Sequence, residues 1–170
     1  FTDCSNLVNV PAIPNSVINM NSTFSRCTNL VNAPVISNSI TNMAYTFAGC
    51  NNLINAPVMP NSVTDMVGTF DTCVNLVNAP VIPNSVTNMS GTFSMCNSLT
   101  GNVYIYSNNI INASNCFASE YNYTSKKYNY NMNYHKDIYV YANTNTYNTF
   151  YKAMGNSTTN TVWNATLKTF

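Results

Sequence analysis

A repeat of 23 residues constrains the fold of this chain more than any other feature of its sequence. Phe, Cys, Leu and Met each recur with this period, so four independent registers agree. The Phe series is Phe1, Phe24, Phe47, Phe70 and Phe93, and the Cys series is Cys4, Cys27, Cys50, Cys73 and Cys96. A period in the twenties indicates a solenoid, because a coil this short buries its apolar side chains only by stacking on its neighbours.

Within one repeat, the segment that runs from Leu to Ile alternates in polarity and is rich in β-branched residues, which predicts a short extended strand. These strands should stack in parallel along one face. A Pro recurs in this segment and has no N–H to donate, so we expect a narrow sheet whose pairing is interrupted there. A turn is predicted at the Pro-Asn-Ser run, and the Thr-Phe-x-x-Cys stretch is expected to close the coil with a single helical turn. We expect the Leu, Ala, Val/Ile, Met, Phe and Cys columns to point inward.

The repeat frame reads Leu-x-x-Ala-Pro-x-Ile-Pro-x-Ser-Val-Thr-x-Met-x-x-Thr-Phe-x-x-Cys, and it resembles the BspA-like leucine-rich-repeat family over residues 1 to about 116. The chain departs from that family in carrying Met where Ile is typical and Thr-Phe where Ala-Phe is common. The resemblance implies a leucine-rich-repeat solenoid of 23-residue coils with short parallel strands. It also implies a secreted or surface adhesin that binds host proteins, other bacteria or glycans, and such repeats suit phage tail and fibre proteins. It supplies no catalytic residue.

The pattern decays after Leu99, and we divide the chain into a solenoid over residues 1–116 and an aromatic capping region over residues 117–170. Eleven of the twelve Tyr lie at or after Tyr104. Residues 118–136 are interpreted as one irregular coil or a long loop. A strand is predicted over residues 137–142 and a closing strand over residues 161–170 around Trp163. Together with the helix described next, they would form a small α+β cap over the open end of the solenoid.

The predicted helix of this cap rests on four apolar or aromatic residues with helical spacing, which are Tyr147, Phe150, Tyr151 and Met154. Thr144 or Asn145 is predicted as its N-cap and Gly155 as its C-cap.

Composition argues against several classes of function. Only 6% of the residues are charged and the net charge is +1, which argues against nucleic acid and against an anionic membrane surface as partners. No apolar stretch is long enough to span a bilayer, so membrane insertion is not expected. About a fifth of the chain is Asn, so the surface is polar but nearly neutral. The chain opens at Phe1 in mid-repeat without Met, and we expect a fragment or a mature product of something longer.

No catalytic, cofactor or metal site is predicted. The five acidic residues are scattered, and Asp65 and Asp71 are interpreted as incidental surface substitutions. There is one His, His135, and no Gly-rich phosphate loop, so neither a Ser-His-Asp set nor a zinc site is expected. The Cys column is interpreted as buried free thiols that pack as small hydrophobes. Neighbouring coils bring the Cys close enough for a bridge, but parallel Cβ vectors make poor disulfide geometry.

Two features are candidate binding sites. The first is the Asn column Asn32, Asn55 and Asn78, which alternates with buried positions and offers repeated donors and acceptors; the alternative is a ladder of amides that bond to one another. The second is the Tyr-rich cap, with Tyr121, Tyr123, Tyr128 and Tyr130 as candidates; the alternative is that these rings bury the end of the solenoid.

The sequence therefore predicts a non-enzymatic extracellular recognition module, located at a cell surface or on a virion, that binds a host or bacterial surface protein or a glycan. The alternative is a structural component of a virion or cell-surface assembly that contacts neighbouring chains or other copies of itself.

Overall fold

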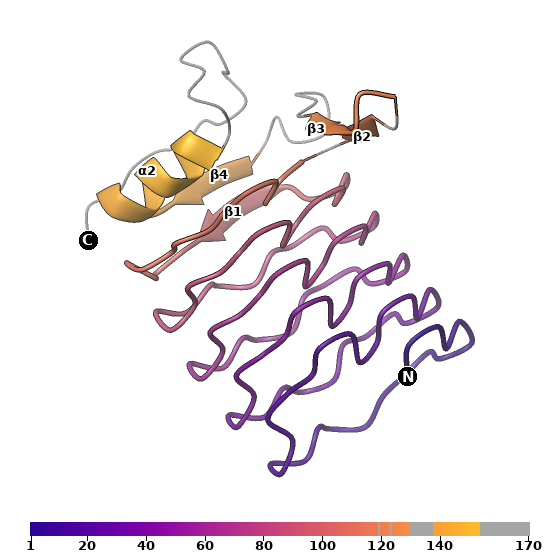
Figure 1. Cartoon of the computed structure of the whole chain (residues 1–170). Coiled ribbons are helices and arrows are strands. Elements are labelled where there is room, and N and C mark those ends of the chain that lie inside the picture. The colour runs from indigo at the N-terminus through magenta and orange to yellow at the C-terminus, as the bar shows by residue number, and fades with distance from the viewer. Residues whose placement is uncertain (119, 123, 130–137, 154–170) are drawn as a thin grey trace.

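The computed structural model describes residues 1–118, 120–122, 124–129 and 138–153. The chain winds into coils that stack on one another from the N-terminus toward strand β1 (Gly101–Tyr104) (Figure 1). Consecutive coils are joined by parallel bridges between residues one repeat apart, for example Asn32 with Asn55 and Asn55 with Asn78. The extended segments of the coils before β1 thus pair through isolated bridges rather than through continuous strands.

The core is a set of columns that run along the stack. Six Phe rings stack with centroids 5.4 to 5.7 Å apart and planes within 20° of parallel, from Phe1 through Phe117. Cys27, Leu30 and Met43 represent the other columns and are fully buried. The Ala column is only partly buried but packs against this core. Burial of one large apolar side chain contributes roughly 1.5–3 kcal/mol, so each coil stabilises the fold mainly through its contacts with the coils above and below.

Small polar side chains in the core bond to the backbone of the preceding coil. The Cys73 thiol donates to the carbonyl of Phe47 at 3.0 Å, and the Thr69 hydroxyl donates to the carbonyl of Met43 at 3.0 Å. The Ser62 hydroxyl donates to the carbonyl of Ile40 at 2.5 Å. The same bonds recur from coil to coil, which explains why Cys, Thr and Ser are fixed in the repeat: each hydroxyl or thiol finds a backbone acceptor in the preceding coil, so no side-chain donor is left without a partner at these positions.

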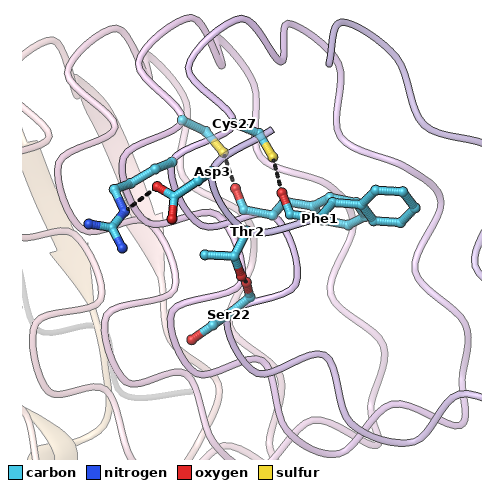
Figure 2. Close-up of polar contacts among 8 residues, drawn as sticks. Phe1, Thr2, Asp3, Ser22 and Cys27 are labelled. Carbon is cyan, nitrogen blue, oxygen red and sulfur yellow. Dashed lines mark hydrogen bonds and ion pairs between the residues drawn. The ribbon is translucent and has the colours of Figure 1, made fainter. Parts of the chain in front are cut away.

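Figure 2 shows the first of these contacts, where the Cys27 thiol faces the carbonyl of Phe1 at 3.1 Å. Beside it, the Thr2 hydroxyl donates to the carbonyl of Ser22 at 2.7 Å, and Asp3 forms an ion pair with Arg26 at 2.8 Å. Both charged side chains of this pair are more than 60% exposed, so it contributes little to stability.

The corner of each coil contains two residues with left-handed backbone, four positions apart. In the third coil they are Gly68 and Thr72, with φ of 54° and 58°. A helical turn was predicted at the Thr-Phe-x-x-Cys stretch, and the structure has successive turns instead because one left-handed residue precedes the stretch and the other lies within it, directly before the Cys. Gly68 is also required by a close approach, since a Cβ there would lie 2.4 Å from the ring of Tyr45.

Strand β1 forms at the point where the repeat loses its Pro. Pro11, Pro34, Pro57 and Pro80 occupy one column, and the next member of that column is Val103. With an N–H restored, residues Gly101–Tyr104 pair in parallel with β4 (Ile138–Tyr141), and Val103 lies opposite Val140. The last coil is thereby joined to the cap (Figure 1).

The segment predicted as an irregular coil or a long loop contains an antiparallel hairpin. Strands β2 (Glu120–Asn122) and β3 (Lys127–Asn129) pair with Tyr121 opposite Tyr128. Lys126, just before β3, has φ of 54°. A residue with this backbone conformation in a turn is more often Gly or Asn. Because a Lys stands here, the sequence lacked the usual signal of a hairpin turn.

Helix α2 (Thr144–Ala153) follows β4, and its N-cap is Asn143 rather than Thr144 or Asn145. The Asn143 side-chain oxygen accepts the N–H of Thr146 at 3.0 Å. The Asn143 amide and the Thr146 hydroxyl also donate to the carbonyl of Ser107, which holds this end of the helix on the last coil. Met154, Gly155 and the predicted closing strand over residues 161–170 lie outside the described residues.

Candidate binding face

The Asn residues singled out in the sequence lie on the exposed surface of the coils. Asn32, Asn55 and Asn78 form one row, are all exposed and are joined by parallel backbone bridges. The Asn78 amide donates to the Asn55 side-chain oxygen at 2.9 Å, whereas Asn32 makes no side-chain hydrogen bond within the described part of the chain. The alternative prediction, a ladder of amides that bond to one another, therefore holds between Asn78 and Asn55, and amide groups of the row remain exposed to solvent.

An open groove, here called the asparagine groove, has a volume of about 430 Å³. Its lining residues come from neighbouring coils and are Val31, Asn52, Ile54, Asn75, Val77 and Ser98. None of the three members of the asparagine row lines this groove; Val31, Ile54 and Val77, which do, each precede a member of the row by one residue in the chain. The Ile54 side chain is 46% exposed and supplies apolar surface to the groove. The groove thus combines an aliphatic lining with amide groups.

The asparagine row and groove carry no formal charge. Residues 28–41, 51–64 and 74–87 contain no Asp, Glu, Lys, Arg or His. A neutral surface of amides and aliphatic side chains offers hydrogen bonds and apolar contact but no ion pair. The chemistry available here is recognition of an uncharged partner.

Sequence reasoning identified the asparagine row but missed the exposed apolar residue beside it. The signal was present, because the core Leu of each repeat is followed directly by Val or Ile, as in Leu53-Ile54. In an extended segment successive side chains point to opposite faces, so two adjacent apolar residues cannot both enter the core.

Of the four cap Tyr residues predicted as candidate binding residues, the structure describes the backbone of two. Tyr121 and Tyr128 are Cα partners in the β2–β3 hairpin, so the backbone brings them together. Tyr123 and Tyr130 lie outside the described residues.

Asp65 lies in a second Asn column, where it replaces Asn without changing the backbone bonds. Its side-chain oxygen accepts the N–H of Val67 at 3.0 Å, and Asn42 accepts the N–H of Ala44 in the same way at 2.8 Å. In this turn the side-chain oxygen of one residue accepts the backbone N–H of the residue two positions later. Asn and Asp both carry such an oxygen, so either residue forms the turn.

Asp71 differs from the prediction of an incidental surface residue. Its Oδ1 atom is buried and has no hydrogen-bond partner among the described residues, and burial raises the pKa of the carboxyl group. The Ser94 side chain and the Thr72 backbone lower this pKa in part, and the negative charge of Asp71 raises the pKa of the buried Cys73 and Cys96 thiols. Among the described residues, no group of three His, Cys, Asp or Glu side chains could hold a metal ion. Because burial is the largest effect on its pKa, ionised Asp71 destabilises the fold.

We therefore expect Asp71→Asn to flatten the dependence of stability on pH. Because the folded pKa is raised, the contribution of Asp71 is greatest below its unfolded value of about 3.9 and is lost as pH rises through the folded value. Urea unfolding at several pH values should show a more stable variant at neutral pH, with the difference shrinking in acid. Asp65→Asn is the matched control and should keep the parent profile. Parallel profiles for the parent and Asp71→Asn would contradict this account.

The Cys column consists of free thiols that are buried apart from Cys4. Burial raises the pKa of Cys50 to about 12 and also raises the pKa of Cys73 well above its usual range. These thiols remain protonated, which suits their role as hydrogen-bond donors to the Phe carbonyls and makes them poor nucleophiles.

Comparison of the chain with protein-family models, with curated proteins and with solved structures finds no match. In the part of the chain that the structure describes, no helix has the length and apolar character that crossing a membrane requires.

Proposed function

We propose that this chain is a non-enzymatic extracellular recognition module whose coil stack is a leucine-rich-repeat solenoid of the BspA-like type. The observation that carries the proposal is the asparagine row beside an open, uncharged groove. In this proposal the module binds a surface protein or a glycan, and the asparagine groove is its primary contact.

The chemistry of the groove favours a neutral, extended ligand such as an uncharged glycan. Asn side chains offer both donors and acceptors to hydroxyl groups, while Ile54 and its neighbours provide apolar contact. Parallel coils repeat about every 4.8 Å, so equivalent groups recur along the stack and a polymer could use several of them at once. A ligand without charge would bind with little dependence on salt.

The Tyr-rich cap is the alternative location for the ligand. Tyr121 and Tyr128 share a hairpin at the end of the stack, and Tyr side chains give rigid contact area at low entropic cost. The asparagine groove is preferred because it presents the amides of Asn52 and Asn75 beside the exposed aliphatic side chain of Ile54.

A structural component of a virion or cell-surface assembly is the second candidate function. It is favoured by a separate line of exposed Val side chains, among which Val58 is 88% exposed. A contiguous apolar surface of this kind is typical of a contact with another protein.

The proposed function is tested by a screen of the recombinant chain on an array of neutral and acidic glycans, beside an Ile54→Ser variant. Ile54 lines the groove and is partly exposed, so its replacement should weaken binding to neutral glycans without unfolding the protein. We expect a loss of at least tenfold in apparent affinity. Binding that persists unchanged in Ile54→Ser would contradict the assignment to the groove.

Two further variants serve as controls. Val74→Ser replaces an apolar residue of similar exposure that does not line the groove, and it should bind as the parent does. A variant with Ser at the four cap tyrosines should also keep its binding. If only this cap variant loses binding, the ligand site belongs to the cap instead.

A further inference from the structure

The asparagine groove runs along the stack of coils rather than across it. Its lining residues form two series with the 23-residue period, an aliphatic wall and a polar wall. The aliphatic wall is Val31, Ile54 and Val77, and the polar wall is Asn52, Asn75 and Ser98. In each coil the polar position precedes the aliphatic one by two residues, so the groove begins at Val31 and reaches Ser98 three coils further along the stack seen in Figure 1. A ligand that fills the groove therefore lies along the stack axis.

The two walls offer different chemistry on the same surface. The polar and aliphatic positions flank the buried Leu of each repeat, as Asn52 and Ile54 flank Leu53, so both point outward. The Asn52 amide donates to the Asn29 side-chain oxygen at 3.3 Å, which leaves the Asn52 oxygen as an acceptor. The Asn75 side chain makes no hydrogen bond within the described part of the chain. A ligand in the groove thus meets free donors and acceptors on one side and apolar surface on the other.

The spacing of the coils distinguishes two kinds of extended ligand. Parallel strands lie about 4.8 Å apart, so the groups of each wall recur at about that interval. In an extended peptide the side chains on one face are roughly 6.6 Å apart, because each residue advances the chain by about 3.3 Å, and a peptide would lose register within a few coils. In a linear glycan whose rings are joined through equatorial bonds at opposite positions, each sugar unit advances the chain by one ring length, which is close to the coil spacing. The groove therefore favours a glycan of this kind.

We propose that the asparagine groove holds a linear, neutral, equatorially linked glycan along the stack axis, with one sugar unit on each coil. The hydroxyl groups at one edge of the glycan bond to the polar wall, where Asn75 is the central member, and the C–H surface of the rings packs on Ile54 and its neighbours. This assignment rests on the proposed recognition function and adds to it the class of the ligand, its direction and the side chains that hydrogen-bond it. Those side chains belong to the polar wall, whereas the asparagine row predicted from the sequence does not line the groove.

The test is isothermal titration calorimetry of the full chain with glycan series of increasing length. The extended series are β-1,4-linked oligomers of glucose, of mannose and of N-acetylglucosamine, and the comparison is the α-1,4-linked series of glucose, whose chain coils. At least one extended series should bind with an affinity that rises over the first few units and levels off once the groove is covered. The coiled series should bind on the order of tenfold more weakly, because its hydroxyl groups cannot match the polar wall in successive coils.

Asn75→Ala should weaken binding of the longest extended oligomer about three- to tenfold, the usual contribution of one hydrogen bond. Asn61→Ala is the matched control, because Asn61 is exposed and does not line the groove, and it should bind as the parent does. Equal affinity at every length, equal binding of the coiled series, or an Asn75→Ala variant that binds like the parent would overturn this assignment and leave the recognition function standing. If no glycan binds, either here or on the array, the recognition of glycans fails together with it.

Discussion

Phe70→Ala is expected to lower the free energy of unfolding by about 3–5 kcal/mol, the usual cost of removing a buried Phe side chain. Phe70 is fully buried and stacks on Phe47 and Phe93 with centroids 5.7 Å away on both sides. Its removal leaves a cavity between two coils and takes an aromatic partner from each neighbour. Since every coil is stabilised by the coils that flank it, damage in the middle of the stack affects both sides.

Urea unfolding followed by circular dichroism measures this loss. Val58→Ala is the control, because the Val58 side chain is 88% exposed and contributes little to the core, and its midpoint should remain close to that of the parent. A loss below about 1 kcal/mol for Phe70→Ala would show that the Phe column is not the main support of the stack.

Val103→Pro is expected to release the cap while leaving the earlier coils folded. Pro occupies this position in the preceding coils, so the coil itself accepts it, but β1 would lose an N–H opposite Val140 of β4. A Pro in a strand removes a ladder hydrogen bond, and leaving the facing carbonyl unpaired costs about 1–3 kcal/mol, which corresponds to a change of roughly 5- to 150-fold in the opening equilibrium.

Hydrogen exchange measured by mass spectrometry distinguishes the two regions. The amides of β4 (Ile138–Tyr141) should exchange much faster in Val103→Pro, while the amides of Met66 and Phe70, which donate to the next coil, stay protected. Val103→Ala separates the lost N–H from the lost packing, and it should keep β4 protected to a greater degree. Equal acceleration in both variants would mean that packing at Val103, rather than strand pairing, holds the cap.

The sequence predicted the buried columns because four residue types share one period and large apolar residues must be covered. Leu30 and Phe47 are examples of positions that periodicity alone places in the core. It predicted the corners less well, since Tyr45 and Thr72 adopt left-handed backbone that these residue types rarely show. The β2–β3 hairpin was missed for a similar reason. The predicted N-cap, Thr144 or Asn145, lay one or two residues too late, because Asn and Thr are both good N-caps and only the bond from the Thr146 N–H to Asn143 decides between them.

The sequence predicted one part of the candidate site, the asparagine row, but not the exposed aliphatic residues. The repeat predicts that Asn55 belongs to a row, but strict alternation from the buried Leu53 would turn Asn55 inward, and the structure shows it exposed. The exposure of Ile54 and Val58 was not predicted, because an apolar residue in every repeat is normally assigned to the core and only the geometry of the coil shows which ones face solvent. The burial of Asp71 depends on the packing of adjacent coils and has no signature in its own repeat.

The central claim is that the repeat face, at the asparagine groove, is where the ligand binds. It is tested most directly by methyl NMR of the chain titrated with the strongest neutral glycan from the array. We predict that the methyl signals of Val31, Ile54 and Val77 shift together and saturate at one Kd. The methyl signals of the exposed Val35, Val58 and Val81, which do not line the groove, should stay in place. Shifts confined to the capping region, or signals in the groove that do not move while the ligand binds, would contradict the claim.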